Sequence, residues 1–292
     1  MIKKVYVLFV AVTLISCSKS DRIAKQSPTV HYEIGNPYPL GEQWFYPEEN
    51  FAYNSTGLAS VSSKSKGELT ANGEIYNPES MTGGHPTLQL PSIVQVKNLD
   101  NGKTITIRLN DRIHTLPARL LELTPKAAHL LNMDLHLPAK VEVTEVEKAS
   151  QKLAFELPNG PQTQMQVQTA PLDTIKVENL DGFPINSRPN SVQNILTKSV
   201  FNSTHVLPEL PAIVTQGSAI GGDLWIEGGS FTSRIYARRF AARMNGKLIT
   251  QYKNGKRSIR VLRGPYQSVN QADQDLNYLI KSGIKGAKII VE

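Results

Sequence analysis

Residues 93–109 read IVQVKNLDNGKTITIRL, and this stretch decides the fold of the first half of the chain. Residues 93–96 and 104–109 are rich in Val, Ile and Thr with apolar side chains at alternate positions, which is typical of strands. Between them, Asn101-Gly102 supplies the positive φ that a tight hairpin turn needs. The stretch therefore predicts two antiparallel strands.

The sequence that follows adds a short helix and another strand. Thr124-Pro125 has the form of an N-cap followed by proline at the first helical position. This predicts a helix over 125–132, with Ala128, Leu130 and Leu131 facing a core. Residues 140–146 alternate again and place Val141 and Val143 on one side. Together these elements predict a compact barrel-like β domain over residues 57–147.

The C-terminal residues 223–292 have a different pattern, in which the predicted order is β-α-β-β-α-β. Ser233 caps a first helix, and a second helix over 270–282 buries Ala272, Leu276 and Leu279 before it stops at Gly283. This order is the split βαβ arrangement of ferredoxin-like domains. The fold class is thus mainly β plus α+β.

The first 17 residues predict export and lipid attachment. Lys3 and Lys4 precede an apolar run over 5–15, which is about half of the ~20 residues that a membrane span needs. Residues 1–16 are therefore expected to be a signal peptide. Leu14-Ile15-Ser16-Cys17 has the form of a lipobox, so Cys17 is the expected lipidation site and the mature N-terminus. An ordinary secretory signal is the alternative.

Cys17 is the only cysteine of 292 residues, which excludes internal disulfides and cysteine-based metal sites. Ser18 after it favours the outer membrane. We expect residues 17–56 to be a tether and residues 148–222, which are polar and proline-punctuated, to be a flexible linker.

Charge is concentrated at the C-terminal end. The chain carries +7 in total, whereas residues 223–292 hold 13 basic and 5 acidic side chains. Such asymmetry often indicates a polyanionic partner. Export argues against nucleic acid, and residues 258–261 lack the aromatics of an RNA-recognition strand.

Three segments of the first domain concentrate residues suited to chemistry: TANGEIYN at 70–77, GHPTLQLP at 84–91 and RLNDR at 108–112. Taken alone, each is ambiguous. Asp111 beside Arg112 is usually a surface ion pair, His85 a hydrogen-bonded loop residue, and Glu74 an exposed turn residue. The histidines show no metal-ligand spacing, and we predict neither a metal nor a cofactor.

In combination and order, these segments resemble the rare lipoprotein A family of septal-ring lytic transglycosylases, whose motifs TANGE-Y, TAAH-TLP and RVNDRGPF they match. The resemblance covers about residues 33–147. The C-terminal residues resemble the sporulation-related (SPOR) domain, notably at 226–231 and 260–266. The two resemblances together imply a six-stranded double-psi β-barrel, a linker and a SPOR domain that binds peptidoglycan.

The resemblance implies an endolytic lytic transglycosylase that cuts denuded glycan strands, which lack stem peptides, and leaves 1,6-anhydromuramoyl ends. The substrate's own C6 hydroxyl closes the ring, so one acid/base group suffices, where a hydrolase needs two carboxylates. Asp111 maps onto the essential aspartate, His85 onto its partner and Glu74 onto a supporting position. The implied location is the periplasmic face of a membrane at the division septum, with septal-ring proteins as further partners.

The sequence departs from the family at two places beside the expected cleft. Val61-Ser62-Ser63 replaces Trp-Tyr-Gly, which removes aromatic surface for sugar stacking. Ile113-His114-Thr115 replaces Gly-Pro-Phe and removes a turn glycine next to Asp111. The alternative is therefore a non-catalytic glycan-binding division lipoprotein of the same architecture.

Overall fold

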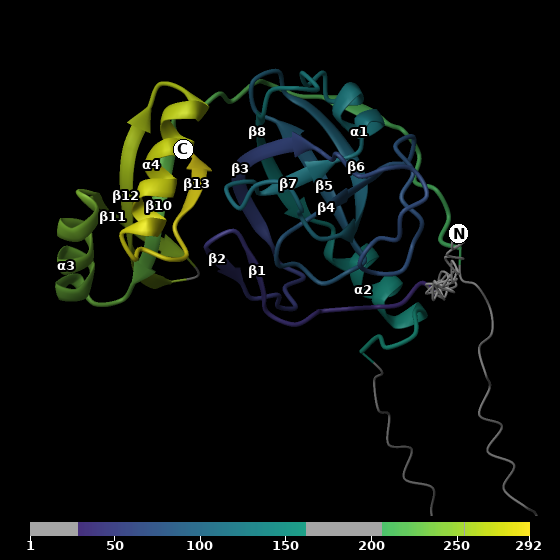
Figure 1. The fold of residues 1–292 in the computed structure, drawn as a ribbon, viewed down its shortest axis with the longest axis horizontal. Helices are drawn as coiled ribbons and strands as arrows, with labels where there is room; N and C mark the ends of the chain where they lie inside the picture. The colour runs from purple at the N-terminus through teal and green to yellow at the C-terminus, as the bar shows by residue number, and fades with distance from the viewer. Residues whose placement is uncertain (1–28, 162–205, 254) are drawn as a thin grey trace, which may run out of the picture.

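The computed structural model describes residues 29–161, 206–253 and 255–292, which form a β-barrel and a smaller α/β domain beside it (Figure 1). Cys17, the signal peptide and the middle of the expected linker lie outside these residues. The described part of the chain has no helix long and apolar enough to cross a bilayer.

Six strands close into the barrel, in the order β4-β7-β3-β8-β5-β6 and back to β4. They are β3 (Asn54–Val61), β4 (Thr82–Gly84), β5 (Ser92–Asn98), β6 (Lys103–Asp111), β7 (Leu121–Leu123) and β8 (Ala139–Glu145). Two of the pairings, β3 with β7 and β4 with β6, are parallel, and the others are antiparallel. This closed six-stranded double-psi β-barrel confirms the expected fold.

Two glycines permit the closure. A Cβ atom on Gly83 would lie 2.6 Å from the Glu122 carbonyl oxygen, and one on Gly84 would lie 2.8 Å from the Arg112 carbonyl oxygen. Real Cβ atoms do not approach backbone so closely, so only glycine lets β4 fit between β6 and β7. The pairing places Gly84 opposite Asp111.

The predicted local elements of the barrel are confirmed. β5 and β6 form the expected hairpin, and Gly102 has φ of +78°. The helix α1 (Pro125–Leu130) begins after Thr124, whose hydroxyl accepts from the Ala127 N–H. Val141 and Val143 are fully buried. Aliphatic side chains of β3, β5, β6, β7, β8 and α1 fill the interior, together with residues of the connecting loops.

The C-terminal domain has the predicted β-α-β-β-α-β order. Its elements are β10 (Leu224–Phe231), α3 (Arg234–Met244), β11 (Lys247–Lys253), β12 (Lys256–Tyr266), α4 (Val269–Lys281) and β13 (Lys288–Val291). The antiparallel sheet has the order β11-β12-β10-β13. Ala272, Leu276, Leu279 and Ile280 of α4 are buried, as the period of the sequence predicts.

The expected tether is wrong from residue 29 onward. Residues 38–45 form a small hairpin of β1 (Tyr38–Leu40) and β2 (Gln43–Phe45). Val30, Tyr32 and Phe45 are buried, and Glu33 pairs through its backbone with Leu90. Burial of these apolar side chains, spaced too irregularly to form a recognisable strand pattern, holds the segment on the barrel.

The expected flexible linker is wrong at both ends. Residues of α2 (Glu147–Glu156) continue from β8, and Ala154 and Leu157 bury against Val30 and Tyr32. After residue 205 the chain runs along the barrel, where β9 (Val214–Gln216) pairs with β6 at 103–105. Backbone pairing rather than apolar burial holds β9, which leaves no periodic signal in the sequence.

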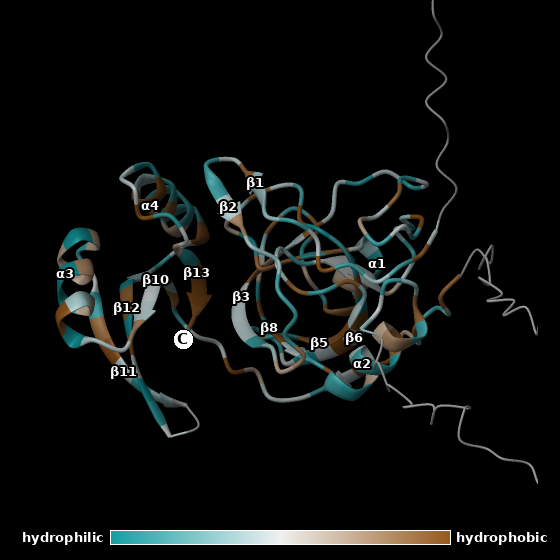
Figure 2. Cartoon of the chain, turned by 90° about the horizontal axis from the view of Figure 1, so that it is seen from below, coloured by the Kyte–Doolittle hydropathy of each residue, from teal (hydrophilic) through white to brown (hydrophobic). Residues whose placement is uncertain are grey.

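The two domains are in direct contact (Figures 1 and 2). Arg119 of the barrel donates two hydrogen bonds of 2.8 Å to the two carboxylate oxygens of Asp273 on α4. The Thr56 hydroxyl of β3 donates to the Val291 carbonyl and accepts from its N–H. Leu58 of β3 joins the core of the C-terminal domain. The barrel thereby covers β13, the edge strand of the second sheet.

The Arg119–Asp273 pair should stabilise the docked arrangement asymmetrically. The Arg119 side chain is 5% exposed and that of Asp273 is 24% exposed. Asp273→Ala leaves a buried cation without its anion and should cost ~3 kcal/mol. Arg119→Met leaves a carboxylate that water reaches, so it should cost less. Urea unfolding measures both.

Glu156→Ala is the control for this comparison, because its partner Lys152 lies 3.9 Å away on an exposed helix face. It should unfold like the unsubstituted protein. Equal costs for Asp273→Ala and Arg119→Met would contradict the inferred burial of Arg119.

Candidate active site

Asp111 lies at the end of β6, where β4 closes the barrel, and only 6% of it is exposed. Its Oδ1 accepts hydrogen bonds from the backbone N–H groups of Ala71 (3.0 Å) and Arg112 (2.9 Å). Its Oδ2 accepts from the Lys64 Nζ at 2.5 Å. The carboxylate is therefore held by two backbone donors on one oxygen and by the largely buried Lys64 ammonium on the other.

The TANGE loop that supplies the Ala71 N–H is tied to β6. Its turn is closed by the Thr70 N–H, which donates to the Glu74 carbonyl, and Gly73 has φ of +85°. The Asn72 N–H donates to the Asn110 carbonyl. The loop is thus bonded to the backbone of Asn110, the residue before Asp111, and this holds the Ala71 N–H against the Asp111 carboxylate.

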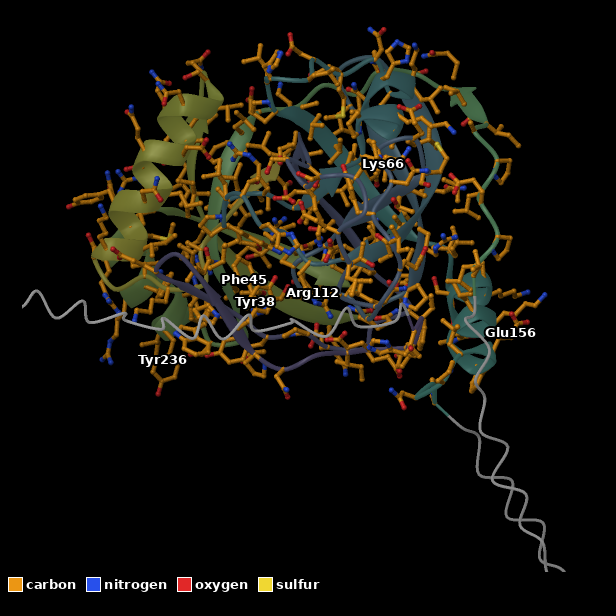
Figure 3. All side chains as sticks on the ribbon, turned by 45° about the vertical axis from the view of Figure 1, so that its right-hand side comes forward. Tyr38, Phe45, Lys66, Arg112, Glu156 and Tyr236 are labelled. Carbon is orange, nitrogen blue, oxygen red and sulfur yellow. The ribbon has the colours of Figure 1, made fainter. Side chains whose placement is uncertain are left out.

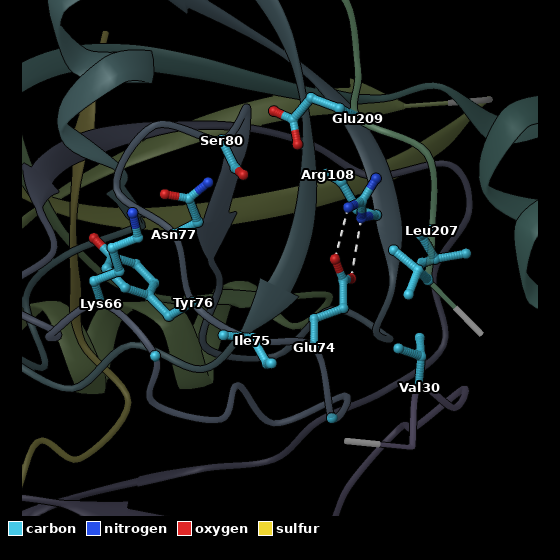
Figure 4. Close-up of a pocket in the computed structure, with 13 residues that line it drawn as sticks. Val30, Lys66, Glu74, Ile75, Tyr76, Asn77, Ser80, Arg108, Leu207 and Glu209 are labelled. Carbon is cyan, nitrogen blue, oxygen red and sulfur yellow. Dashed lines mark hydrogen bonds and ion pairs between the residues drawn. The ribbon is translucent and has the colours of Figure 1, made fainter. Parts of the chain in front are cut away.

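Glu74 fastens this loop through an ion pair with Arg108 of β6 (Figure 4). Arg108 Nε and Nη2 donate to the two carboxylate oxygens at 3.0 and 2.6 Å, and the Asn72 side chain donates to Oε1. The side chains of Glu74 and Arg108 line a pocket of about 400 Å³. Because both carboxylate oxygens are engaged, Glu74 is placed to position the loop rather than to transfer a proton.

His85 follows β4, and its N–H donates to the Asp111 carbonyl. Its ring, however, is fully buried and turned toward its own loop. Nδ1 accepts from the N–H groups of Thr87 and Leu88 at 3.1 and 3.0 Å, so Nε2 carries the proton and donates to the Tyr53 hydroxyl at 3.1 Å. The backbone of His85 therefore contacts Asp111, whereas its imidazole ring does not contact the Asp111 carboxylate.

Burial, together with the positive charges of Arg112 and Lys288, lowers the pKa of His85 from 6.5 to about 3. The neutral ring orders the loop of residues 85–88. Arg112 holds the same loop from its other side, because its guanidinium donates to the carbonyls of Leu88, His85 and Ile34.

Two residues that the sequence interpretation missed complete the surroundings of Asp111. Lys64 supplies the ion pair, and Glu122 of β7 is buried. Glu122 Oε1 accepts from the N–H groups of His114 and Thr115 and from the Thr115 hydroxyl. Neither residue lies in the segments 70–77, 84–91 or 108–112, although Glu122 belongs to a further stretch, 119–124, that resembles the family's Arg-x-Ile-Asp-Leu-Ser element, and each reaches the site through the closure of the barrel.

The altered residues beside Asp111 fit into this frame. Ile113 is buried, and Glu122 holds the turn at 114–115 that a glycine and proline would otherwise shape. The His114 ring is half exposed, and its Nε2 lies 3.8 Å from Asp111 Oδ1. Ser62 lines a small hollow together with Asp111 and Glu122, where Trp or Tyr would be bulkier.

The described residues contain no group of three or more His, Cys, Asp or Glu side chains placed to hold a metal ion. The hollow instead holds two buried carboxylates: Asp111, with a lysine and a half-exposed histidine beside it, and Glu122, of which Oε1 is engaged by three donors of residues 114 and 115. A carboxylate such as that of Asp111 can donate a proton to a leaving oxygen and accept one from a hydroxyl.

Comparison with known proteins defines the class. Residues 48–146 match the double-psi β-barrel family described as Lytic transglycolase, and residues 221–290 match the SPOR domain. The barrel is thus similar to lytic transglycosylase barrels, and the C-terminal domain is similar to SPOR domains.

Proteins named endolytic peptidoglycan transglycosylase RlpA are similar in sequence to part of this chain. The protein of Pseudomonas aeruginosa is 34% identical over 158 residues, which are 48% of this chain and 46% of the relative. That of Yersinia pestis is 39% identical over 95 residues (32% and 26%), and that of Rickettsia bellii 31% over 126 residues (42% and 56%). The resemblance to the rare lipoprotein A family is confirmed, although the matches span only about a quarter to somewhat over half of these three relatives.

The lowered pKa of His85 predicts that its ring stays neutral throughout the range from pH 5 to 8. Nitrogen-15 NMR of the ring should show an unprotonated Nδ1 and a protonated Nε2 without titration in this range. A midpoint near the ordinary value of 6.5 would contradict the burial of the ring and return His85 to the list of proton-transfer groups.

Proposed function

We propose that the protein is an endolytic lytic transglycosylase that cleaves peptidoglycan glycan strands lacking stem peptides. The observation that supports this most is the buried carboxylate of Asp111, which has backbone donors on one oxygen and the Lys64 ammonium on the other. The names of the relatives and the barrel's family point to the same reaction class.

In the proposed reaction the bond between C1 of a muramoyl residue and the O4 of the next sugar breaks. Asp111 protonates O4 as it leaves, and the muramoyl C6 hydroxyl attacks C1. The hydroxyl proton then passes to the Asp111 carboxylate, so that the product carries a 1,6-anhydro ring and no water is consumed. Glu74 and His85 act as positioning residues for the loops on either side.

Lys64 has a specific part in this scheme. Its ammonium must leave Oδ2 for the carboxyl group to carry a proton, and the flexible four-carbon chain of lysine allows such a movement in principle. A bound strand that displaces Lys64 would thus prepare the acid.

The second candidate is a glycan-binding protein without catalysis. The small size of the hollow at Asp111 and the replacement of the aromatic pair by Val61-Ser62 favour it. The two functions differ in their products, since only the enzyme generates anhydro ends.

Asp111→Asn tests the choice. With amidase-treated sacculi as substrate, the protein should release strands with 1,6-anhydro ends, and Asp111→Asn should lower the rate at least 10²-fold. Asp100→Asn, an exposed acid on the β5–β6 turn, is the matched control and should keep full activity. Anhydro ends at an unchanged rate from Asp111→Asn would exclude the assignment, and none from either protein would favour the binding function.

We further propose that acylated Cys17 holds the protein on the periplasmic face of the outer membrane and that the SPOR domain enriches it at the division septum. A fluorescent fusion truncated after Gly222 should lose midcell enrichment, whereas a full-length fusion carrying Asp111→Asn should keep it. Immunoblots at equal protein level control for degradation. Midcell enrichment of the truncated fusion would refute the targeting role.

A further inference from the structure

A second pocket lies at the junction of the two domains, away from Asp111. It has a volume of about 330 Å³ and is formed by Tyr53 and four separate stretches of the chain. The four stretches are the β2 region at 43–48, the barrel loops at 86–87 and 117–120, and residues 286–289 before and in β13. Figures 1 and 2 show the β1–β2 hairpin standing beside the C-terminal domain. This junction pocket therefore exists only while the domains are docked.

One side of the junction pocket is aromatic. In β2, Gln43 and Phe45 point inward and are buried, whereas Trp44 points outward and is 50% exposed. Tyr46 follows and is 66% exposed. Phe45 is braced from behind by Tyr38, whose ring stacks on it at 5.6 Å (Figure 3). A rigid hairpin thus presents two half-exposed aromatic rings at a concave surface, where they offer apolar area that folding does not bury.

Two residues that line the junction pocket each carry a buried polar atom with no hydrogen-bond partner among the described residues, Gln43 Oε1 and Arg119 Nε. Each side chain is held by its other atoms, since Gln43 Nε2 donates to the Ala287 carbonyl and the Arg119 Nη atoms bind Asp273. Buried polar atoms are normally paired. One is an acceptor and the other a donor, and a hydroxyl group can satisfy either.

These observations specify the ligand. Aromatic faces suit the apolar C–H face of a sugar ring, and an acceptor beside a donor suits its hydroxyl and acetamido groups. The two cations of the lining, Arg119 and Lys288, are paired with Asp273 and Glu227, and Glu48 adds a carboxylate, so the pocket favours a neutral polar ligand over the carboxylates of a stem peptide. We propose that the junction pocket binds an N-acetylhexosamine ring of a glycan strand, which rests on the proposed function for the identity of the polymer.

The junction pocket and the site at Asp111 share the loop of residues 85–88. The wall of the pocket includes Pro86 and Thr87, whose carbonyls accept from the Tyr38 hydroxyl and the Glu48 N–H. That loop is the one His85 and Arg112 hold in place. The pocket therefore adds a distant subsite that contacts the strand with residues of both domains.

The test uses the full chain and the tetramer of N-acetylglucosamine as a neutral probe. In a Trp225→Phe background, which leaves Trp44 as the single tryptophan, titration should give a saturable change in fluorescence. Tyr46→Ala in the same background should weaken binding at least tenfold. Tyr252→Ala, which removes an equally exposed tyrosine outside the pocket, should leave binding unchanged.

Calorimetry of Trp44→Ala provides a second measurement, and circular dichroism confirms that each variant is folded. No saturable change, equal binding by Tyr46→Ala, or displacement of the tetramer by a free stem peptide would overturn the proposal. Asp111→Asn should bind the tetramer normally. If Asp111→Asn still cleaves strands, the proposed catalytic function is wrong, while the proposal for the junction pocket is unaffected. If the unsubstituted protein cleaves strands but does not bind the tetramer, only the proposal for the junction pocket is wrong.

Discussion

The parallel pairing of β4 with β6 is the constraint on which the site depends. It requires Gly83 and Gly84, because any Cβ there would meet backbone of neighbouring strands. Once β4 is in place, the chain can leave it only along the rim, so that residues 85–88 lie beside the end of β6. Asp111 is thereby enclosed by a strand that is short and stiff and by loops that are tied to it.

The charged groups around Asp111 differ in how many contacts hold them. Arg108 with Glu74 and Arg112 with three carbonyls are bound through rigid forks, which give geometric precision. The Lys64 ammonium has one partner, Asp111, and the half-exposed His114 ring lies 3.8 Å from Asp111 and 4.0 Å from Glu122. The frame therefore fixes the carboxylate by paired donors, whereas the groups that balance its charge are held by fewer or longer contacts.

The sequence predicts those parts of the fold that local periodicity controls. The hairpin at 93–109, the helix after Thr124 and the order of the C-terminal elements follow from side-chain spacing within a few residues. Asp111 and Glu74 were found by motif, and both lie where the barrel closes. The sequence could not show that the ring of His85 turns away from Asp111, because its orientation depends on Tyr53 and two backbone groups of its own loop.

What the sequence missed are contacts between distant segments. Arg119 and Asp273 are 154 positions apart, and Lys64 meets Asp111 only across the barrel. Residues 29–53 and 206–222 have too little periodicity to predict a structure of their own, and they are ordered by burial of single side chains and by pairing with strands already formed.

The contacts of Leu157 and Leu207 bear on what determines the distance between the two domains. Both side chains belong to the one apolar cluster around Val30 and Tyr32. The chain that joins them therefore begins and ends at the same place on the barrel. The distance between the two domains does not depend on the length of this segment. The spacing between Asp111 and the C-terminal sheet is set instead by contacts between the two domains, such as those of Arg119 with Asp273 and of Thr56 with Val291.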